Sequence, residues 1–461
     1  MASFVDKPAG MRTSLVLLLL ISCGDDNAPI SPPDAPPPID SPVADSPPGV
    51  DDFTAAEQAL LAQLTPLGAP PTDPTNAFAD DPKAAALGQM LFFDKSISGA
   101  IVVGDDGTNG GLGAAGATGK ASCASCHAAG SESLDDRRSK PNNVSLGTNF
   151  MTRNSLGLVN SSYYAWTNWG GRFDSQWSLP LAVAENPTTM RSTRLQVVHL
   201  LFDKYRTEYD ATFPVPLDAA IADLSRFPAI AKPKAAADPD GPFEAMAQPD
   251  RDLVNRIYAN YGKALAAYTR TLISRDAPFD RYVAGDRDAI GEVAKRGVHL
   301  FLEHCTDCHI GANFADDQFH ALVVSQTGPH VPAIDNARFN DVVPLLVSPF
   351  NTIGTFSDNI TTGKLVGLVQ VESQRGQFRT KSLRNIADSA PYMHAGQLAT
   401  LADVVAFYNV GGGDVGTTGI VKDPRIQPLN LDDAQQADLV AFLETLTGES
   451  VPADRVVDTS K

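Results

Sequence analysis

Two Cys-x-x-Cys-His strings, at residues 123–127 and 305–309, constrain this chain more than any other feature of its sequence. Each string offers two thiols that can add to the vinyl groups of a haem, followed by an imidazole that can bind the iron. Zinc sites also use such pairs but join their halves over short loops, whereas about 180 residues separate these two. A thioredoxin-like redox pair accounts for one string but not for a repeat. We therefore predict two covalently bound haems, with attachment residues Cys123, Cys126, Cys305 and Cys308 and iron ligands His127 and His309.

The fifth cysteine, Cys23, ends the string LISC at residues 20–23, behind an apolar run at residues 15–21. This run is too short to span a bilayer and follows Arg12, so residues 1–23 are predicted to be an export signal. The string resembles a lipoprotein cleavage box, after which Cys23 carries a lipid; a plain cleaved signal with an incidental cysteine is the alternative. The expected location is the periplasm, with the lipid as the only membrane anchor.

Residues 24–52 are rich in proline, aspartate, serine and alanine, and they include a triple proline at 36–38. Such a segment buries too little apolar surface to offset its chain entropy, and its prolines keep it extended. We predict a disordered tether here, ahead of a globular part long enough for two domains. With 36 basic and 54 acidic residues the formal net charge is −18, which argues against nucleic acid as a partner and favours a basic electron-transfer protein.

Beyond residue 52, apolar residues recur mainly at helical spacing, and few alternating runs indicate strands. A capping box at Thr54 predicts a helix there, and further helices are predicted over residues 252–273, from about 290 into the second haem string, and from about 432 to 446. We predict a mainly α protein with long loops and two cytochrome c-like haem domains. The expected segments are 53–240 and 241–450, with the boundary region at 238–249 and a tail at 451–461.

Several further motifs occur in a fixed order around the haem strings, between residues 78 and 448. They are Leu87-Gly88, Leu91-Phe92-Phe93-Asp94, Arg153-Asn154, Asn160, Trp169-Gly170-Gly171-Arg172, Asn186-Pro187, Phe378-Arg379-Thr380, Leu383-Arg384-Asn385 and Ala390-Pro391-Tyr392-Met393-His394. This order resembles the bacterial dihaem cytochrome c peroxidase and MauG superfamily. The resemblance covers nearly all of the predicted globular part.

The resemblance implies a division of labour between the two haems. In that superfamily the N-terminal haem meets hydrogen peroxide, the C-terminal haem stores and relays electrons, and one tryptophan lies between them. The motif context identifies this residue as Trp169, with Trp166 as the alternative; a tryptophan that only packs is the other interpretation. The resemblance also implies a structural calcium ion, bound by the side chain of Asn154 and the carbonyls of Ser389 and Pro391.

Two departures from the superfamily concern the iron ligands. Conventional members hold a histidine over the N-terminal iron, in the segment that corresponds to residues 141–152, and this segment contains none. We therefore predict an open peroxidatic iron, with Met151 as the alternative ligand. At the C-terminal iron, the superfamily's axial methionine falls at Tyr408, as in MauG-like members, and a phenolate should lower the potential of that haem. The alternative is that Tyr408 only packs, and that Met393 or His394 is the ligand.

A third departure concerns the acid–base group. Peroxide cleavage benefits from a carboxylate that moves a proton from one oxygen to the other. Thr189 occupies the superfamily's glutamate position. Glu185, one helical turn earlier, is the candidate replacement, or else a carboxylate that is only solvated or on the calcium side. Arg172 and His320 are further candidates for this role.

The predicted function is reduction of hydrogen peroxide with electrons from a small redox protein, either a cytochrome c or a cupredoxin. The first alternative is a MauG-like or MbnH-like enzyme that oxidises a Trp or Tyr of a partner protein, which Tyr408 and the missing histidine favour. The second is a non-catalytic dihaem electron carrier, which Thr189 favours. Both alternatives require the same two haems.

Overall fold

A computed structural model of the chain describes residues 49–130, 144–234, 240–416 and 419–461. The predicted signal peptide at 1–23, its Cys23 and most of the tether at 24–52 lie outside the described residues. Part of the expected boundary region and residues 141–143 of the segment without a histidine also lie outside them.

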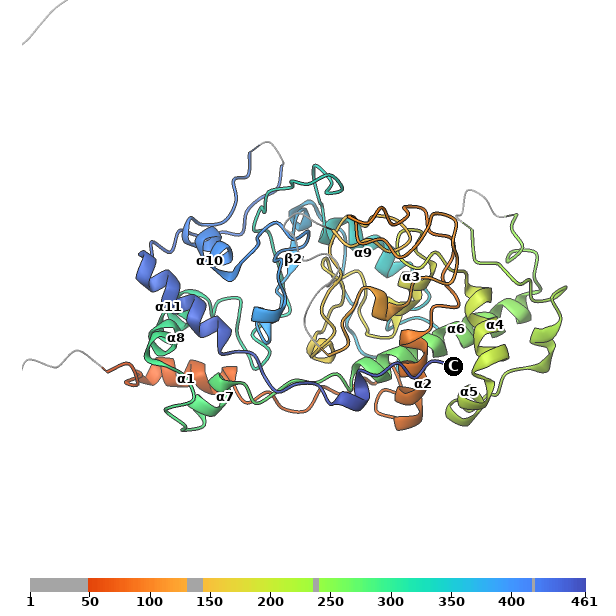
Figure 1. Cartoon of the computed structure of the whole chain (residues 1–461), viewed down its shortest axis with the longest axis horizontal. Coiled ribbons are helices and arrows are strands. Elements are labelled where there is room, and N and C mark those ends of the chain that lie inside the picture. The colour runs from red at the N-terminus through yellow and green to blue at the C-terminus, as the bar shows by residue number, and fades with distance from the viewer. Residues whose placement is uncertain (1–48, 131–143, 235–239, 417–418) are drawn as a thin grey trace, which may run out of the picture. The chain divides into compact units, whose positions relative to one another are not determined.

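The described residues form mainly α-helices joined by long loops (Figure 1). The helices are α1 (Ala55–Leu64), α2 (Pro82–Phe93), α3 (Ser178–Glu185), α4 (Arg194–Lys204), α5 (Arg206–Thr212), α6 (Gln248–Thr269), α7 (Pro278–Val283), α8 (Glu292–His304), α9 (Arg338–Leu346), α10 (Leu401–Asn409) and α11 (Asp433–Glu444). The strands β1 (Phe319–His320) and β2 (Phe378–Arg379) pair antiparallel, with Phe319 opposite Arg379. The predicted mainly α fold class is confirmed.

Helix boundaries follow from local sequence. The Thr54 hydroxyl accepts from the Glu57 N–H at 3.2 Å, and the Glu57 carboxylate accepts from the Thr54 N–H at 2.8 Å, which is the predicted capping box of α1. An equivalent box opens α11 at Asp432. The helix expected over 252–273 is α6, which begins earlier because Pro249 suits a first turn, where no intrahelical N–H is required.

One hydrophobic core is built on α6, which packs against α2, α3 and α4. The α6 side chains Ile257, Tyr261 and Leu265 are almost completely buried, as the helical spacing predicted. Gly88 of α2 lies against the carbonyl of Ala264, where any larger side chain would overlap it, so the two backbones approach closely there. Cys123 packs against this core, and the first haem string is therefore attached to it.

A second core is built on α8 and α11, with α1, α7 and α10 around them. Gly297 of α8 lies against the carbonyl of Asp438 in α11, which repeats the close glycine contact of the first core. The ring centre of Phe301 lies 4.8 Å from that of Phe442, in the middle of this core. Cys305 packs against it. Each haem string therefore lies on its own pair of closely packed helices.

The hydrophobic contacts change from the first core to the second after α6, because α6 belongs to the first and α7 to the second. The cores do not divide at one point in the sequence, since Phe350 and Val451 pack into the first core and Leu61 and Leu64 into the second. The predicted boundary at residues 238–249 stays a prediction.

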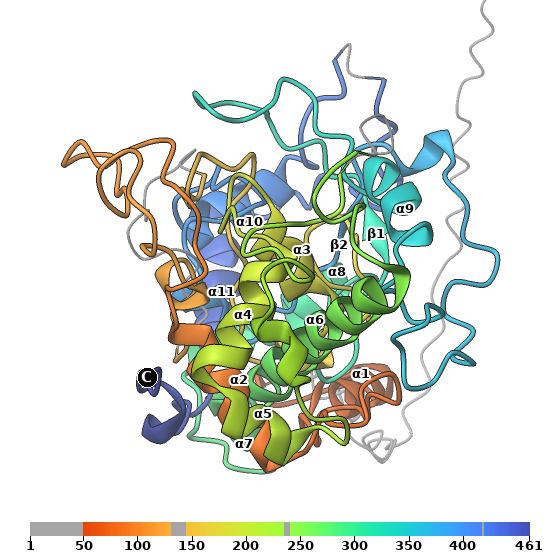
Figure 2. The same ribbon diagram turned by 90° about the vertical axis from the view of Figure 1, so that its right-hand side faces the viewer.

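The ends of the globular part connect the two cores. α1 packs into the second core, whereas Val451 packs into the first (Figures 1 and 2). The predicted tail at 451–461 is held in place, because the hydroxyl of Tyr268 in α6 donates to the carbonyl of Arg455 at 2.6 Å. Segments from both ends of the globular chain therefore cross between the cores.

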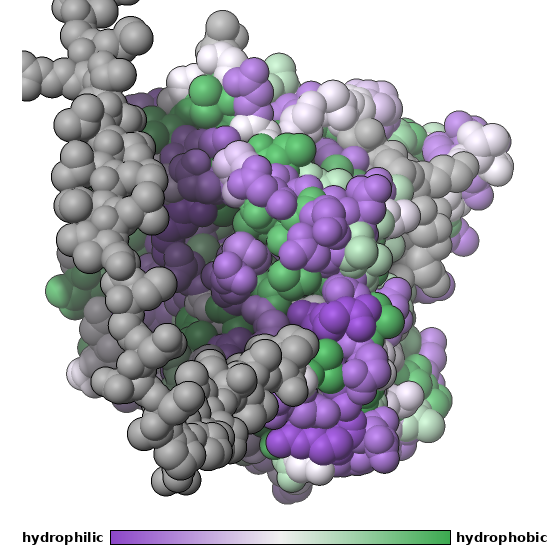
Figure 3. All heavy atoms as spheres, turned by 90° about the vertical axis from the view of Figure 1, so that its left-hand side faces the viewer, coloured by the Kyte–Doolittle hydropathy of each residue, from purple (hydrophilic) through white to green (hydrophobic). Residues whose placement is uncertain are grey.

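The length and apolar character of the helices, and the hydropathy of the surface, show how the described residues relate to a membrane. Within the described ranges, no helix combines the length and the apolar character needed to cross a bilayer. On the face shown in Figure 3, hydrophobic and hydrophilic residues are interspersed. Hydrophilic side chains therefore make up much of this face.

Candidate haem sites

A cavity of about 720 Å³ lies beside the second haem string. Cys305, Cys308 and His309 belong to its lining, and Tyr408 of α10 lines it too. Much of the remaining lining is apolar, including Leu322, Val324, Leu383, Val405 and Leu439. Cofactor pockets commonly measure roughly 300–1,000 Å³ and are mostly apolar. The residues present therefore fit a haem attached at this string.

The histidines of both haem strings are held in the same way. Nδ1 of His309 lies 2.9 Å from the carbonyl oxygen of Phe314, and Nδ1 of His127 lies 2.8 Å from that of Leu156. A carbonyl oxygen only accepts, so Nδ1 carries the proton and Nε2 keeps its lone pair for a metal. Burial also lowers the pKa of His309, which favours the neutral, ligating form. In this tautomer Nε2 is the ring nitrogen that carries the lone pair in both histidines.

The first cysteine of each string lies in apolar surroundings. Cys123 opens the short helix η1 (Cys123–Ser125), and Cys305 follows α8. Burial raises the pKa of both thiols to about 12. An uncharged thioether suits this environment better than the thiolate that a zinc site requires. The surroundings of the sulfur atoms therefore favour haem attachment over zinc binding.

Tyr408 and His394 both line the cavity, but only one has an oxygen or nitrogen available to a metal. Within the described part of the chain, the Tyr408 hydroxyl makes no hydrogen bond, and burial raises its pKa. His394 Nε2 lies 2.9 Å from the amide of Gln326 and 3.2 Å from that of Gln397, while its ring stacks on Phe378 at 4.0 Å. Of these two side chains, Tyr408 is therefore the one whose oxygen has no hydrogen bond within the described residues and is available to a metal.

Trp169 is buried and lies on the edge of the same cavity. Its Nε1–H donates to the carbonyl of Asn154 at 2.7 Å, and its ring meets that of His394 edge-on, with centres 6.4 Å apart. The Asn154 N–H in turn donates to the carbonyl of His394 at 2.8 Å. Trp169 therefore joins the segment that follows the first haem string to the cavity of the second.

Two of the predicted calcium residues, Asn154 and Pro391, lie beside the same glycine, although more than 230 positions separate them. A Cβ placed on Gly396 would lie 2.8 Å from the Asn154 amide nitrogen and 2.9 Å from Pro391, so both residues flank this glycine. The Asn154 side-chain oxygen is buried and has no hydrogen-bond partner. Ser389 is buried nearby in sequence. A buried amide oxygen without a hydrogen-bond partner is a ligand that suits Ca²⁺.

Glu185 lies at the end of α3, where Arg194 holds its carboxylate. The Nε and terminal N–H groups of Arg194 donate to the two carboxylate oxygens at 3.2 and 3.1 Å. The Thr189 hydroxyl donates to the carbonyl of Val183. Arg172, a further candidate, lies over the ring of Phe173 at 6.0 Å. The structure thus pairs Glu185 with a guanidinium rather than with another predicted site residue.

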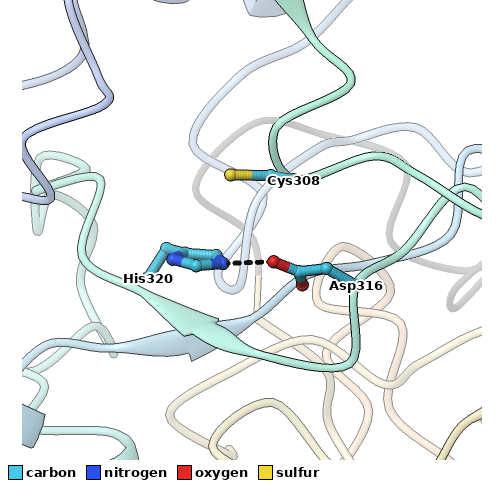
Figure 4. Close-up of side chains that lie close together, drawn as sticks. All are labelled: Cys308, Asp316 and His320. Carbon is cyan, nitrogen blue, oxygen red and sulfur yellow. Dashed lines mark hydrogen bonds and ion pairs between the residues drawn. The ribbon is translucent and has the colours of Figure 1, made fainter.

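His320, on β1, sits in a charged network beside Cys308 (Figure 4). Its Nε2 lies 2.8 Å from Asp316, its Nδ1 lies 2.8 Å from Asp423, and Arg425 bonds to Asp423 at 2.8 Å. Burial opposes protonation, but Asp316, the free thiol of Cys308 and Asp423 outweigh it and raise the pKa of His320 to about 10. His320, Asp316, Asp423 and Arg425 thus form a cluster of charged side chains beside the second haem string.

Sequence reasoning named His320 but missed its partners. Asp316 precedes it by one helical turn of sequence, which is a weak signal in a segment that forms no helix. Asp423 lies 103 positions away, on a different loop. Only the folded chain brings these charges together.

Comparisons with known proteins agree with this geometry. A family model described as di-haem cytochrome c peroxidase matches residues 82–288. The cytochrome-c peroxidase IdrP1 of Denitromonas iodatirespirans is 31% identical over 411 residues, which cover 86% of this chain and 90% of the relative. The methylamine utilization protein MauG of Methylorubrum extorquens is 34% identical over 188 residues, covering 40% of this chain and 43% of the relative.

Solved structures support the fold. A MauG-like protein associated with microbial copper homeostasis superposes with a TM-score of 0.54 at 23% identity, covering 85% of this chain and 98% of its own. Similarity to IdrP1 along most of both chains, together with the two haem strings and their matching histidine contacts, shows that this chain belongs to the di-haem cytochrome c peroxidase family.

Proposed function

We propose that this chain reduces hydrogen peroxide at its N-terminal haem and takes electrons from a redox partner through its C-terminal haem. The observation that carries the proposal is the repeated arrangement of His127 and His309, each with Nδ1 hydrogen-bonded to a backbone carbonyl oxygen. Bound haem supplies the iron that exchanges electrons with peroxide and with the partner. The chain attaches the haems, ligates them and controls access to them.

Each hydrophobic core is proposed to be one haem domain. The first contains α2 and α6 with the string at 123–127, and the second contains α8 and α11 with the string at 305–309. The close glycine contact of each helix pair supports this division. In this proposal α6 belongs to the N-terminal domain.

The proposed roles of single residues follow from their contacts. Trp169 connects the two sites because its indole N–H is fixed on Asn154 and its ring faces the cavity of the second string. Tyr408 would be the second protein ligand of the haem iron that His309 binds, since both residues line the same cavity. Glu185 remains the candidate acid–base group, and its carboxylate has to exchange its contact with Arg194 before it can move a proton.

A MauG-like oxidation of a partner protein is the second candidate function. Two observations favour it: the uncommitted hydroxyl of Tyr408, and the absence of histidine from residues 144–152, the described part of the segment that carries the distal ligand in conventional members. A ligand that favours oxidised iron prolongs the life of the oxidised enzyme. A long-lived oxidised enzyme suits a reaction in which a Trp or Tyr side chain gives up its electrons slowly.

Peroxide titration of the holoprotein separates the candidates. A peroxidase turns over when reduced cytochrome c is present, whereas a MauG-like enzyme forms a long-lived oxidised state and reacts slowly with cytochrome c. Electron paramagnetic resonance of the oxidised protein should show one high-spin and one low-spin ferric signal. Two low-spin signals contradict the open peroxidatic iron, and a holoprotein that shows no spectral change with peroxide contradicts both functions.

We further propose that the chain is exported and lipid-anchored. The support is the sequence alone: Arg12, the short apolar run after it, and Cys23 at the end of a cleavage-box string. The net charge of −18 supports a basic redox partner.

Calcium is proposed at Asn154, Ser389 and Pro391, and its removal should destabilise the protein. At a calcium concentration 100 times the dissociation constant, a single site contributes about 2.7 kcal/mol to folding. Chelation should therefore lower the melting temperature of the wild-type holoprotein, measured by calorimetry. Asn154→Ala should abolish the calcium dependence, whereas Asn154→Asp, which keeps an oxygen ligand, should retain it. A calcium-dependent melting temperature in Asn154→Ala would contradict the assignment.

A further inference from the structure

Trp166, the alternative relay residue, lies between two cationic side chains. The guanidinium carbon of Arg338 is 4.6 Å from the centre of the Trp166 ring, and the ammonium nitrogen of Lys364 is 4.9 Å from it. Arg338 also lies 4.1 Å from the ring centre of Phe319, which meets Trp166 edge-on. Two positive charges therefore face an indole only three positions from Trp169.

Backbone carbonyls hold both cations in place. Arg338 is 3% exposed and donates to the carbonyl of Gly171 at 2.7 Å. Lys364 donates to the carbonyls of Ala165 and Asp174. Neutral acceptors of this kind satisfy the N–H groups without cancelling their charge. The two charges are therefore fixed beside the ring and only partly screened by water.

Burial and neighbouring carboxylates affect the ionisation of both cations. Burial lowers the pKa of Arg338 to about 10, so it stays protonated at neutral pH. Burial also lowers the pKa of Lys364, and its two carbonyl contacts favour the ammonium form. Asp317 accepts from the N–H of Ala165 at 3.2 Å, and burial raises the pKa of this carboxyl group. Asp174 and Asp73 also act on Lys364, and Asp341 acts on Arg338, so carboxylates offset part of both charges. The two cations nevertheless lie directly over the indole ring.

A cation over a neutral indole is attracted to its π electrons. An indole that has lost an electron is itself a cation, and the same neighbour then repels it. Two fixed cations therefore make Trp166 harder to oxidise than an indole without them. Trp166 is half-buried, so a hole that reached it would be open to solvent and lost from the path between the haem sites.

We propose that Arg338 and Lys364 protect Trp166 from oxidation and so confine oxidising equivalents to the route past Trp169. This inference rests on the proposed relay function of Trp169. When no electron donor is present, peroxide oxidises the protein instead. In the net reaction the O–O bond breaks, one C–O bond forms on an indole, and the displaced hydrogen leaves in water; the indole loses two electrons and peroxide gains two.

The test is the oxidation of individual tryptophans in the holoprotein, measured by peptide mass spectrometry after peroxide treatment without donor. In Arg338→Gln and in Lys364→Gln, the fraction of Trp166 that gains one oxygen should rise at least about tenfold over wild type, because each variant removes a unit charge close to the ring. Arg338→Lys keeps the charge and should stay within about twofold of wild type. If Arg338→Gln does not fold, Lys364→Gln alone still tests the proposal.

Arg375→Gln is the matched control, since Arg375 lies 4.0 Å from the ring centre of Phe339, away from any tryptophan contact. It should leave Trp166 oxidation at the wild-type value. Equal Trp166 oxidation in wild type and in both charge-removing variants overturns the proposal. Failure of the Trp169 relay is read separately, from the rate of electron transfer between the haems in Trp169→Phe.

Discussion

Tyr408→Met should raise the reduction potential of the C-terminal haem by more than about 100 mV, because a thioether favours ferrous iron and a phenolate favours ferric iron. The structure supports this expectation in two ways. The Tyr408 oxygen is uncommitted within the described residues, whereas Nε2 of His394 is bonded to Gln326 and Gln397. Spectroelectrochemical titration of the holoprotein measures the potential, and the loss of a phenolate absorption band provides a second readout.

The cavity contains a matched control for this substitution. Tyr392 also lines it, but its hydroxyl is committed to the carbonyl of Ile386 at 3.2 Å. Tyr392→Phe should therefore leave the potential unchanged, and Tyr408→Phe should convert the C-terminal haem to a high-spin form. An unchanged potential and spectrum in Tyr408→Met would exclude Tyr408 and leave His394 or Met393 as the ligand, since both line the same cavity.

The features that sequence predicted well are those that a short stretch of chain determines. A haem string needs only five consecutive residues, and the geometry of His127 and His309 agrees with the chemistry expected of it. The capping box of α1 is similarly local. The apolar spacing of α6 was sufficient to predict its buried face, although not the core to which that face belongs.

Features that depend on two distant segments could not be obtained from such patterns alone. Asn154 meets the carbonyl of His394 only because the loop after the first string folds onto the second haem region. The family resemblance grouped Asn154 with Ser389 and Pro391 for calcium, but neither it nor composition and spacing indicated the contact with His394. Neither the family resemblance nor the sequence pattern indicated the hydrogen bond between His320 and Asp423. Their side chains come from two distant segments, and such a pairing leaves no periodic pattern in the sequence.

The contact between Glu185 and Arg194 shows a different limit. Glu185 does not lie one helical turn from Thr189, because α3 ends at Glu185 and residues 186–189 are not helical. Spacing also says nothing about which charged neighbour a side chain will find. Arg194 lies over the rings of Tyr258 and Phe350 at 4.9 and 5.2 Å, so aromatic packing holds the guanidinium beside the carboxylate. Pairing of this kind is decided by tertiary packing.

Trp169→Phe should slow electron transfer between the two haem sites by at least about tenfold, equivalent to about 1.4 kcal/mol on the barrier. The substitution removes the indole N–H that fixes the ring on the Asn154 carbonyl, together with the most easily oxidised group at that position. Stopped-flow absorption after peroxide addition follows oxidation of the C-terminal haem directly. Rapid oxidation at the wild-type rate would contradict the relay.

Trp177→Phe is the control that separates the relay from a general loss of packing. Trp177 is also fully buried and donates its indole N–H, to Thr75 at 3.0 Å, but it lies within the first core and does not line the cavity of the second string. Trp177→Phe should lower the melting temperature without slowing electron transfer between the haem sites. Because the two substitutions remove the same chemical group, a slower rate in Trp169→Phe alone assigns the effect to the position of that indole between the haem sites.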